Sequence, residues 1–111
     1  MAVSVGNVHL QTDKQAIIDF DAIRAIESET DILLVLHGGS GISPETRRKL
    51  ARETHVCKFN IGTELRMAFG DGLREVLAED PVLFDRLMIM DRIAPAMREA
   101  TTEILRNISV A

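Results

Sequence analysis

Two histidines and two glycine-containing loops are the residues of this sequence best suited to chemistry. His9 follows a short predicted strand, His37 follows an apolar stretch of strand length, and His37 leads directly into Gly38-Gly39-Ser40-Gly41. A second loop, Asn60-Ile61-Gly62-Thr63, follows a third such stretch and also precedes a helix. In parallel α/β sheets the carboxyl ends of the strands meet at one edge, where functional groups gather. The pattern therefore predicts that both histidines and both loops lie at a common edge.

These residues suit two kinds of chemistry. Imidazole is a common zinc ligand, and a catalytic zinc takes three protein ligands and keeps one position open. Only His9 and His37 qualify, because His55 begins a strand and is expected at the opposite edge. Backbone N–H groups in the two loops, with the hydroxyls of Ser40 and Thr63, suit a phosphate. The simpler alternatives are hydrogen-bonded histidines at the sheet edge, ordinary turn glycines, and Thr63 as a helix cap.

The elements that must position these groups alternate between strands and helices. The pattern predicts strands over residues 2–8, 32–36 and 55–61, and helices over 20–29, from 44, over 64–78, after Asp80-Pro81 and over 91–108. Asp19 and Ser43 are predicted N-caps. Such alternation indicates a parallel sheet with right-handed crossovers. Three strands cannot close a barrel or cover both faces of such a sheet, so the chain is expected to be part of a larger domain.

Single residues within these elements carry further expectations. Two-residue alternation in the third strand predicts two faces, Val56, Lys58 and Asn60 on one, and Cys57, Phe59 and Ile61 on the other. Cys57 is expected to be an inert, buried thiol. Pro95 is expected to mark a kink in the last helix or its first turn. Arg47-Arg48-Lys49 is expected to form a solvated helix face.

Composition and charge narrow the class of protein. The 111 residues are 46% hydrophobic and 27% charged, which suits one globular domain. A net charge of -4 without a basic block argues against nucleic acid as a partner. No apolar run is long enough for a membrane span, and Met1-Ala2-Val3-Ser4-Val5 lacks the pattern of a signal peptide. A single cysteine suits a reducing compartment, so the cytoplasm is the expected location.

Longer motifs in the sequence resemble those of a known enzyme family. The segment Leu34–Ile42, followed by Lys58–Arg66, closely resembles the zinc-dependent class II ketose-bisphosphate aldolases, which include fructose- and tagatose-bisphosphate aldolases. Val3–His9 resembles the family's earlier strand, which ends in a zinc histidine, and 80–81 and 94–100 resemble its C-terminal helices. The resemblance implies a (β/α)8 TIM barrel, of which residues 1–111 form the C-terminal part, about strands 6–8 plus terminal helices. A full barrel takes about 250 residues.

The same resemblance implies roles for individual residues. His9 and His37 are expected to bind Zn²⁺. The residues expected to bind the substrate phosphate are Leu10, Gly38, Gly39, Ser40, Asn60, Ile61, Gly62 and Thr63. Leu10 stands where the family usually has a glycine that lines the phosphate site and a monovalent-cation site. The third zinc histidine and the proton-transferring aspartate belong to an earlier strand, so no catalytic base is expected in this chain.

The implied activity is the zinc-dependent aldol cleavage of a ketose bisphosphate into dihydroxyacetone phosphate and an aldehyde, or the reverse condensation. Such an enzyme serves carbohydrate metabolism, for example glycolysis. A phosphorylated sugar is then the expected partner, and the complete protein is expected to be a homo-oligomer, a dimer or tetramer. Two alternatives stay open: an inactive truncated fragment, and a metal-free phosphate-binding α/β module.

Overall fold

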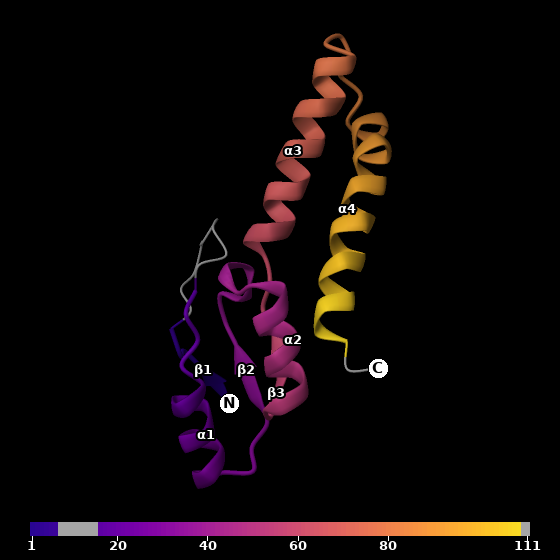
Figure 1. The fold of residues 1–111 in the computed structure, drawn as a ribbon. Coiled ribbons are helices and arrows are strands. Elements are labelled where there is room, and N and C mark those ends of the chain that lie inside the picture. The colour runs from indigo at the N-terminus through magenta and orange to yellow at the C-terminus, as the bar shows by residue number, and fades with distance from the viewer. Residues whose placement is uncertain (7–15, 110–111) are drawn as a thin grey trace.

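The computed structural model of the chain describes residues 1–6 and 16–109, which form a small parallel sheet followed by two long helices (Figure 1). In chain order the elements are β1 (Ala2–Val3), α1 (Phe20–Glu29), β2 (Leu34–Leu36), the 3₁₀ turn η1 (Gly39–Gly41), α2 (Pro44–Glu53), β3 (Val56–Phe59), α3 (Thr63–Glu79) and α4 (Arg86–Ile108). Strands and helices alternate through β3, as the sequence pattern predicts.

The described strands form one sheet in the order β1-β2-β3, and both neighbouring pairs are parallel. Val3 pairs with Leu36 of β2, and Leu36 pairs in turn with Phe59 of β3. The prediction of a parallel sheet is therefore confirmed, although the strands are shorter than expected. Ile32 and Leu33 lie outside β2 and are 57% and 59% exposed, because no described element covers them.

A bulge in β3 overturns the predicted alternation of its side chains. Leu34 pairs with Val56 and Val35 with Lys58, so Cys57 is the extra residue. The extra residue shifts the period, and Val56 and Phe59 both pack on the core instead of facing opposite sides. Cys57 is exposed, so the expectation of a buried thiol is wrong for the described residues.

The core lies between the sheet and the helices α1 and α2. Its buried members are Val5, Ile18, Ile23, Leu34, Leu36, Ile42, Leu50 and Val56. Local signals start both helices as predicted: the Asp19 side chain accepts from the Ala22 N–H, and the Ser43 side chain caps α2 ahead of Pro44. These caps fix where each helix begins and hold its apolar side against the sheet.

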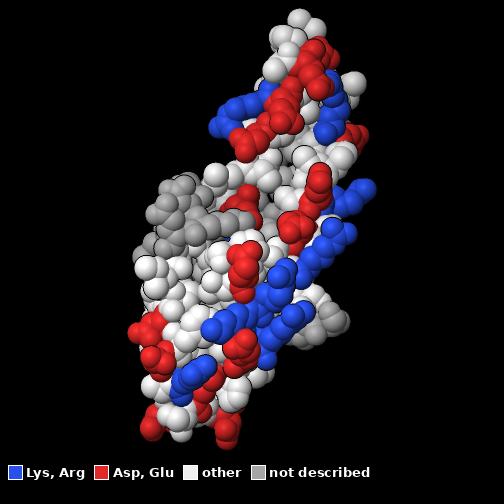
Figure 2. Space-filling view, in the orientation of Figure 1, with Lys and Arg blue, Asp and Glu red and all other residues white. Residues whose placement is uncertain are grey.

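The helices α3 and α4 pack side by side in antiparallel directions and extend beyond the sheet (Figure 1). A methyl group at Gly72 of α3 would lie 3.4 Å from Ile93 Cγ2 of α4, so a small residue allows the close packing. In the space-filling view, basic side chains gather over α2 and the C-terminal half of α4, with acidic side chains beside them (Figure 2). Among the residues described, no helix combines the length and apolar character needed to cross a bilayer.

The start of α4 differs from the sequence prediction. Asp80 ends α3, and the short helix expected after Asp80-Pro81 does not form. Asp85 instead caps α4 by accepting from two backbone N–H groups, so this helix begins at Arg86 rather than near residue 91. Pro95 consequently lies inside α4 and not in its first turn.

Candidate functional site

His37 and Asn60 stand at the carboxyl ends of β2 and β3. The Asn60 N–H donates to the Leu36 carbonyl over 2.8 Å, which extends the pairing of the two strands to their ends. The Asn60 side-chain nitrogen lies 3.0 Å from Nδ1 of His37 and 3.5 Å from its Nε2. The sheet thus brings together two of the residues that the sequence singled out. His55 lies at the other end of β3, as expected.

The glycine loop after His37 packs directly on the residues that follow β3. Gly38 has a φ of 67°, a left-handed conformation that glycine adopts without strain. The Gly39 N–H donates to the Asn60 carbonyl over 3.0 Å. A methyl group at Gly39 would lie 2.9 Å from Cγ1 of Ile61 and 3.2 Å from the Asn60 carbonyl oxygen, so a larger residue could enter only if these neighbours moved. The two predicted phosphate loops therefore touch through their backbones.

Ser40 connects the glycine loop to the start of α3. Its side chain is largely buried, and its Oγ accepts from the Glu64 N–H over 3.1 Å. A hydroxyl that accepts a hydrogen bond still has its own hydrogen to donate. Gly62 is the N-cap of α3 and Thr63 its first residue, so the alternative of Thr63 as the helix cap is wrong.

Several donors at this edge face no acceptor within the described part of the chain. The backbone N–H groups of Ser40 and Thr63 donate to none of the described residues. Thr63 opens a 17-residue helix, whose N-terminus carries partial positive charge. The Arg66 guanidinium donates to Thr63 Oγ1 over 3.2 Å and adds a full positive charge there. This arrangement can bind an anion.

Arg47 is the residue of this region that sequence reasoning missed. It was expected on a solvated face, but its side chain is 0% exposed. Its Nε donates to the Gly39 carbonyl over 3.0 Å, and its Nη2 contacts the Ser40 carbonyl and forms an ion pair with Glu64. The spacing of Arg47 from the buried Leu50, three residues on, was the signal that it lies on the inner side of α2.

The predicted metal site is only partly within the described residues. His9 and Leu10 lie outside them, and among residues 1–6 and 16–109 no group of three or more His, Cys, Asp or Glu side chains is placed to hold a metal ion. The Asn60 amide nitrogen is a donor, so the His37 ring nitrogen that faces it must accept. A neutral imidazole has one acceptor nitrogen, so zinc at His37 would take the lone pair that now faces the Asn60 amide, and further ligands would come from elsewhere.

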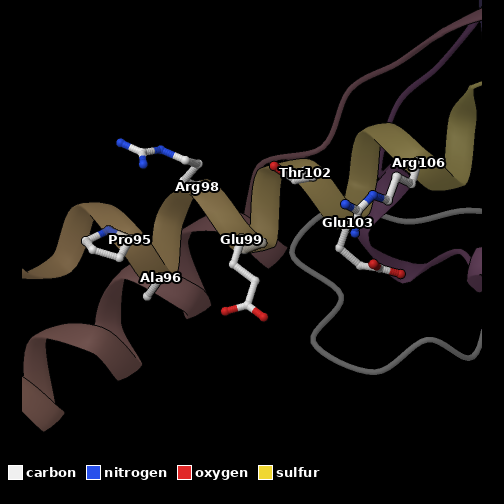
Figure 3. A pocket seen from close by; sticks show the side chains of 8 residues that line it. Pro95, Ala96, Arg98, Glu99, Thr102, Glu103 and Arg106 are labelled. Carbon is white, nitrogen blue, oxygen red and sulfur yellow. The ribbon is translucent and has the colours of Figure 1, made fainter.

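A separate hollow lies along α4 and has a volume of about 700 Å³. All its lining residues come from α4, between Pro95 and Arg106, including Arg98 and Glu99 (Figure 3). None belongs to the two loops, so this hollow is not part of the candidate site.

The whole chain, residues 1–111, matches the family model described as fructose-bisphosphate aldolase class-II. The chain belongs to this family. Among solved structures, the YdjI aldolase from Escherichia coli K12 is similar, with a TM-score of 0.76 and 25% identity over 97% of this chain. The chain spans 38% of that aldolase. The family resemblance seen in the sequence is thus confirmed, and the small parallel sheet with its helices is consistent with part of an aldolase barrel.

Proposed function

We propose that this chain supplies the phosphate-binding edge and part of the zinc site of an aldolase. The reaction is the reversible aldol cleavage of a ketose bisphosphate, with dihydroxyacetone phosphate as one product. The observation that carries the proposal is the contact between the two loops beside His37: Gly39 bonds Asn60, and Ser40 bonds Glu64. Family membership supports the aldol chemistry.

The phosphate is proposed to bind between the two loops. The N–H groups of Ser40 and Thr63 and their hydroxyls donate to its oxygens, while the glycines at 38–39 let the anion approach the backbone. The wider set proposed to line this site is Leu10, Gly38, Gly39, Ser40, Asn60, Ile61, Gly62 and Thr63. Fixing the phosphate fixes the rest of a small ketose relative to His37, and such positioning removes much of the entropic part of a reaction barrier.

His37 and His9 are proposed to hold zinc together with a third ligand from an earlier strand. The ion, when bound, supplies a Lewis acid for the substrate carbonyl. The Asn60 amide nitrogen lies 3.0 Å from His37 Nδ1, close enough to that ring to reach a substrate bound there. The group that transfers the proton is proposed to lie outside this chain, which makes the site complete only with additional residues.

The sheet is proposed to correspond to about strands 6–8 of a (β/α)8 barrel, with residues 1–111 as one partial domain. The strand order β1-β2-β3 and the parallel pairing support this placement. So does the likeness to an aldolase that is longer than this chain. A complete barrel of this family is proposed to act as a homo-oligomer on a phosphorylated sugar.

Calorimetric titration of zinc into the purified chain tests the metal part of the proposal. We expect the His37→Ala variant to bind zinc at least about tenfold more weakly than the wild type, because one strong ligand is lost. His55→Ala is the matched control, since His55 is exposed at the opposite end of β3 and should leave the affinity unchanged. Equal responses from the wild type and His37→Ala would favour the metal-free phosphate-binding module.

An aldol-cleavage assay on the same purified chain distinguishes an active enzyme from an inactive fragment. Turnover that a chelator abolishes means that the chain carries a working site. Zinc and phosphate binding without turnover means that the chain holds half of the site and acts only with additional residues.

A further inference from the structure

We propose that Arg47 is a positioning residue, which shapes the phosphate site through the glycine loop and couples that loop to α3 through its ion pair with Glu64. The inference rests on the proposed phosphate site and deepens it. Arg47 itself bonds the loop carbonyls and is buried behind them, so it acts through the loop.

The burial of Arg47 is the first observation behind this inference. Arginine is almost never fully buried unless it is paired, because removing its charge from water is costly. Here the guanidinium is fully buried, and its Nη1 has no hydrogen-bond partner in the described part of the chain. Buried ion pairs are often no more stabilising than apolar residues of the same size. Stability alone therefore gives little reason for an arginine at this place.

The contacts of Arg47 explain what the side chain does for the loop. The Gly39 carbonyl accepts from Arg47 Nε over 3.0 Å and from the Ile42 N–H over 3.2 Å. A trans peptide is planar, and its C=O and N–H point in opposite directions. Holding the Gly39 carbonyl toward Arg47 thus directs the N–H of Ser40 away from it. That N–H is one of the two donors with no described acceptor, and Arg47 fixes its direction.

The Glu64 end of the ion pair joins the second loop to the first. The Glu64 carboxylate pairs with Arg47, while the Glu64 N–H donates to Ser40 Oγ. Arg47, Ser40 and Glu64 therefore form a closed set of contacts between η1 and the first turn of α3. The donors of Ser40 and Thr63 stand at a fixed separation as long as this set is intact.

Two substitutions separate positioning from simple charge effects. Arg47→Lys keeps the charge, but a single ammonium cannot reproduce the fork that reaches two carbonyls and a carboxylate. Glu64→Gln removes a negative charge near the proposed phosphate. By electrostatics alone this variant should bind phosphate more tightly, whereas by the positioning argument it should bind more weakly. The two explanations thus predict opposite signs.

The experiment is an amide NMR titration of the ¹⁵N-labelled 111-residue chain with inorganic phosphate. We expect Arg47→Lys and Glu64→Gln each to raise the phosphate Kd by about tenfold, the effect of losing one well-placed charge-assisted hydrogen bond. Arg48→Lys and Glu45→Gln are the matched controls, since both residues are exposed on α2, and their Kd should equal that of the wild type.

Each outcome of the titration decides one point. If the wild type shows no phosphate shifts at Ser40 and Thr63, the proposed phosphate site itself fails. If the wild type binds while Glu64→Gln binds equally or more tightly, the positioning role of Arg47 is overturned. If Arg47→Lys does not fold, Glu64→Gln decides alone, because the Glu64 side chain is 24% exposed and glutamine keeps its size.

Discussion

Replacing Gly39 with alanine tests how closely the two phosphate loops must approach each other. The added methyl carbon would lie 2.9 Å from Cγ1 of Ile61 and 3.2 Å from the Asn60 carbonyl oxygen. Carbon atoms in good contact are about 3.5–4.0 Å apart, so the Ile61 side chain must move, and the loop backbones must separate by about a few tenths of an ångström. That movement also stretches the bond from the Gly39 N–H to the Asn60 carbonyl, now 3.0 Å long.

The size of the effect follows from these contacts. Overpacking of a well-packed site costs about 1–3 kcal/mol, and weakening one backbone hydrogen bond costs about 0.5–1.5 kcal/mol. We expect Gly39→Ala to lose about 2 kcal/mol of unfolding free energy, which lowers the Tm of a domain of this size by roughly 8–16 °C. The phosphate affinity should fall as well, because the two loops move apart.

Gly70→Ala is the matched control, with an effect of opposite sign. Gly70 lies inside α3, and the closest atom to a methyl group there is Nη1 of Arg74, 3.4 Å away at the end of an exposed side chain. Alanine favours a helix interior over glycine by about 1 kcal/mol. Thermal and urea denaturation of both variants make the comparison. A Gly39→Ala variant as stable as the wild type, with unchanged phosphate binding, would refute the close approach of the loops.

Further predictions concern α4 and β3. Asp85→Ala should destabilise the chain by about 1 kcal/mol in urea denaturation, because two N–H groups at the start of α4 lose their cap. Asp91→Ala within the same helix should have little effect, and equal losses would place the start of α4 elsewhere. The thiol of Cys57 should react with a disulfide reagent in the folded chain without strong protection, since the residue is exposed and its Sγ has one contact, 3.5 Å from the Leu34 carbonyl, among the described residues. Strong protection would contradict the bulge in β3.

Local signals made much of this fold predictable from the sequence. Asp19 and Ser43 start α1 and α2 through bonds to their own first turns, which depend on neighbours along the chain alone. The meeting of His37 and Asn60 follows from a general property of parallel strands, whose carboxyl ends lie at one edge. These features require no knowledge of distant contacts.

Contacts between distant segments account for the features that the sequence did not predict. The bulge at Cys57 arises from the pairing of β3 with β2, and a single extra residue changes which side chains face the core. The spacing of Arg47 from Leu50 indicated the inner side of α2, but its partners, carbonyls in η1 and a carboxylate in α3, are not visible from the sequence of α2. The start of α4 at Arg86 is the exception, because its signal is local: Asp85 is a good capping residue.

The central claim is that the loops 38–41 and 60–63 form one phosphate site beside His37. The most direct measurement is the titration of the wild-type chain with inorganic phosphate, followed at single amides by NMR. The account predicts that the amide chemical shifts of Ser40 and Thr63 follow one binding curve with a common Kd, while the amide chemical shifts in the middle of α4 do not change. Shifts at one loop only, or two curves with different Kd values, would contradict it.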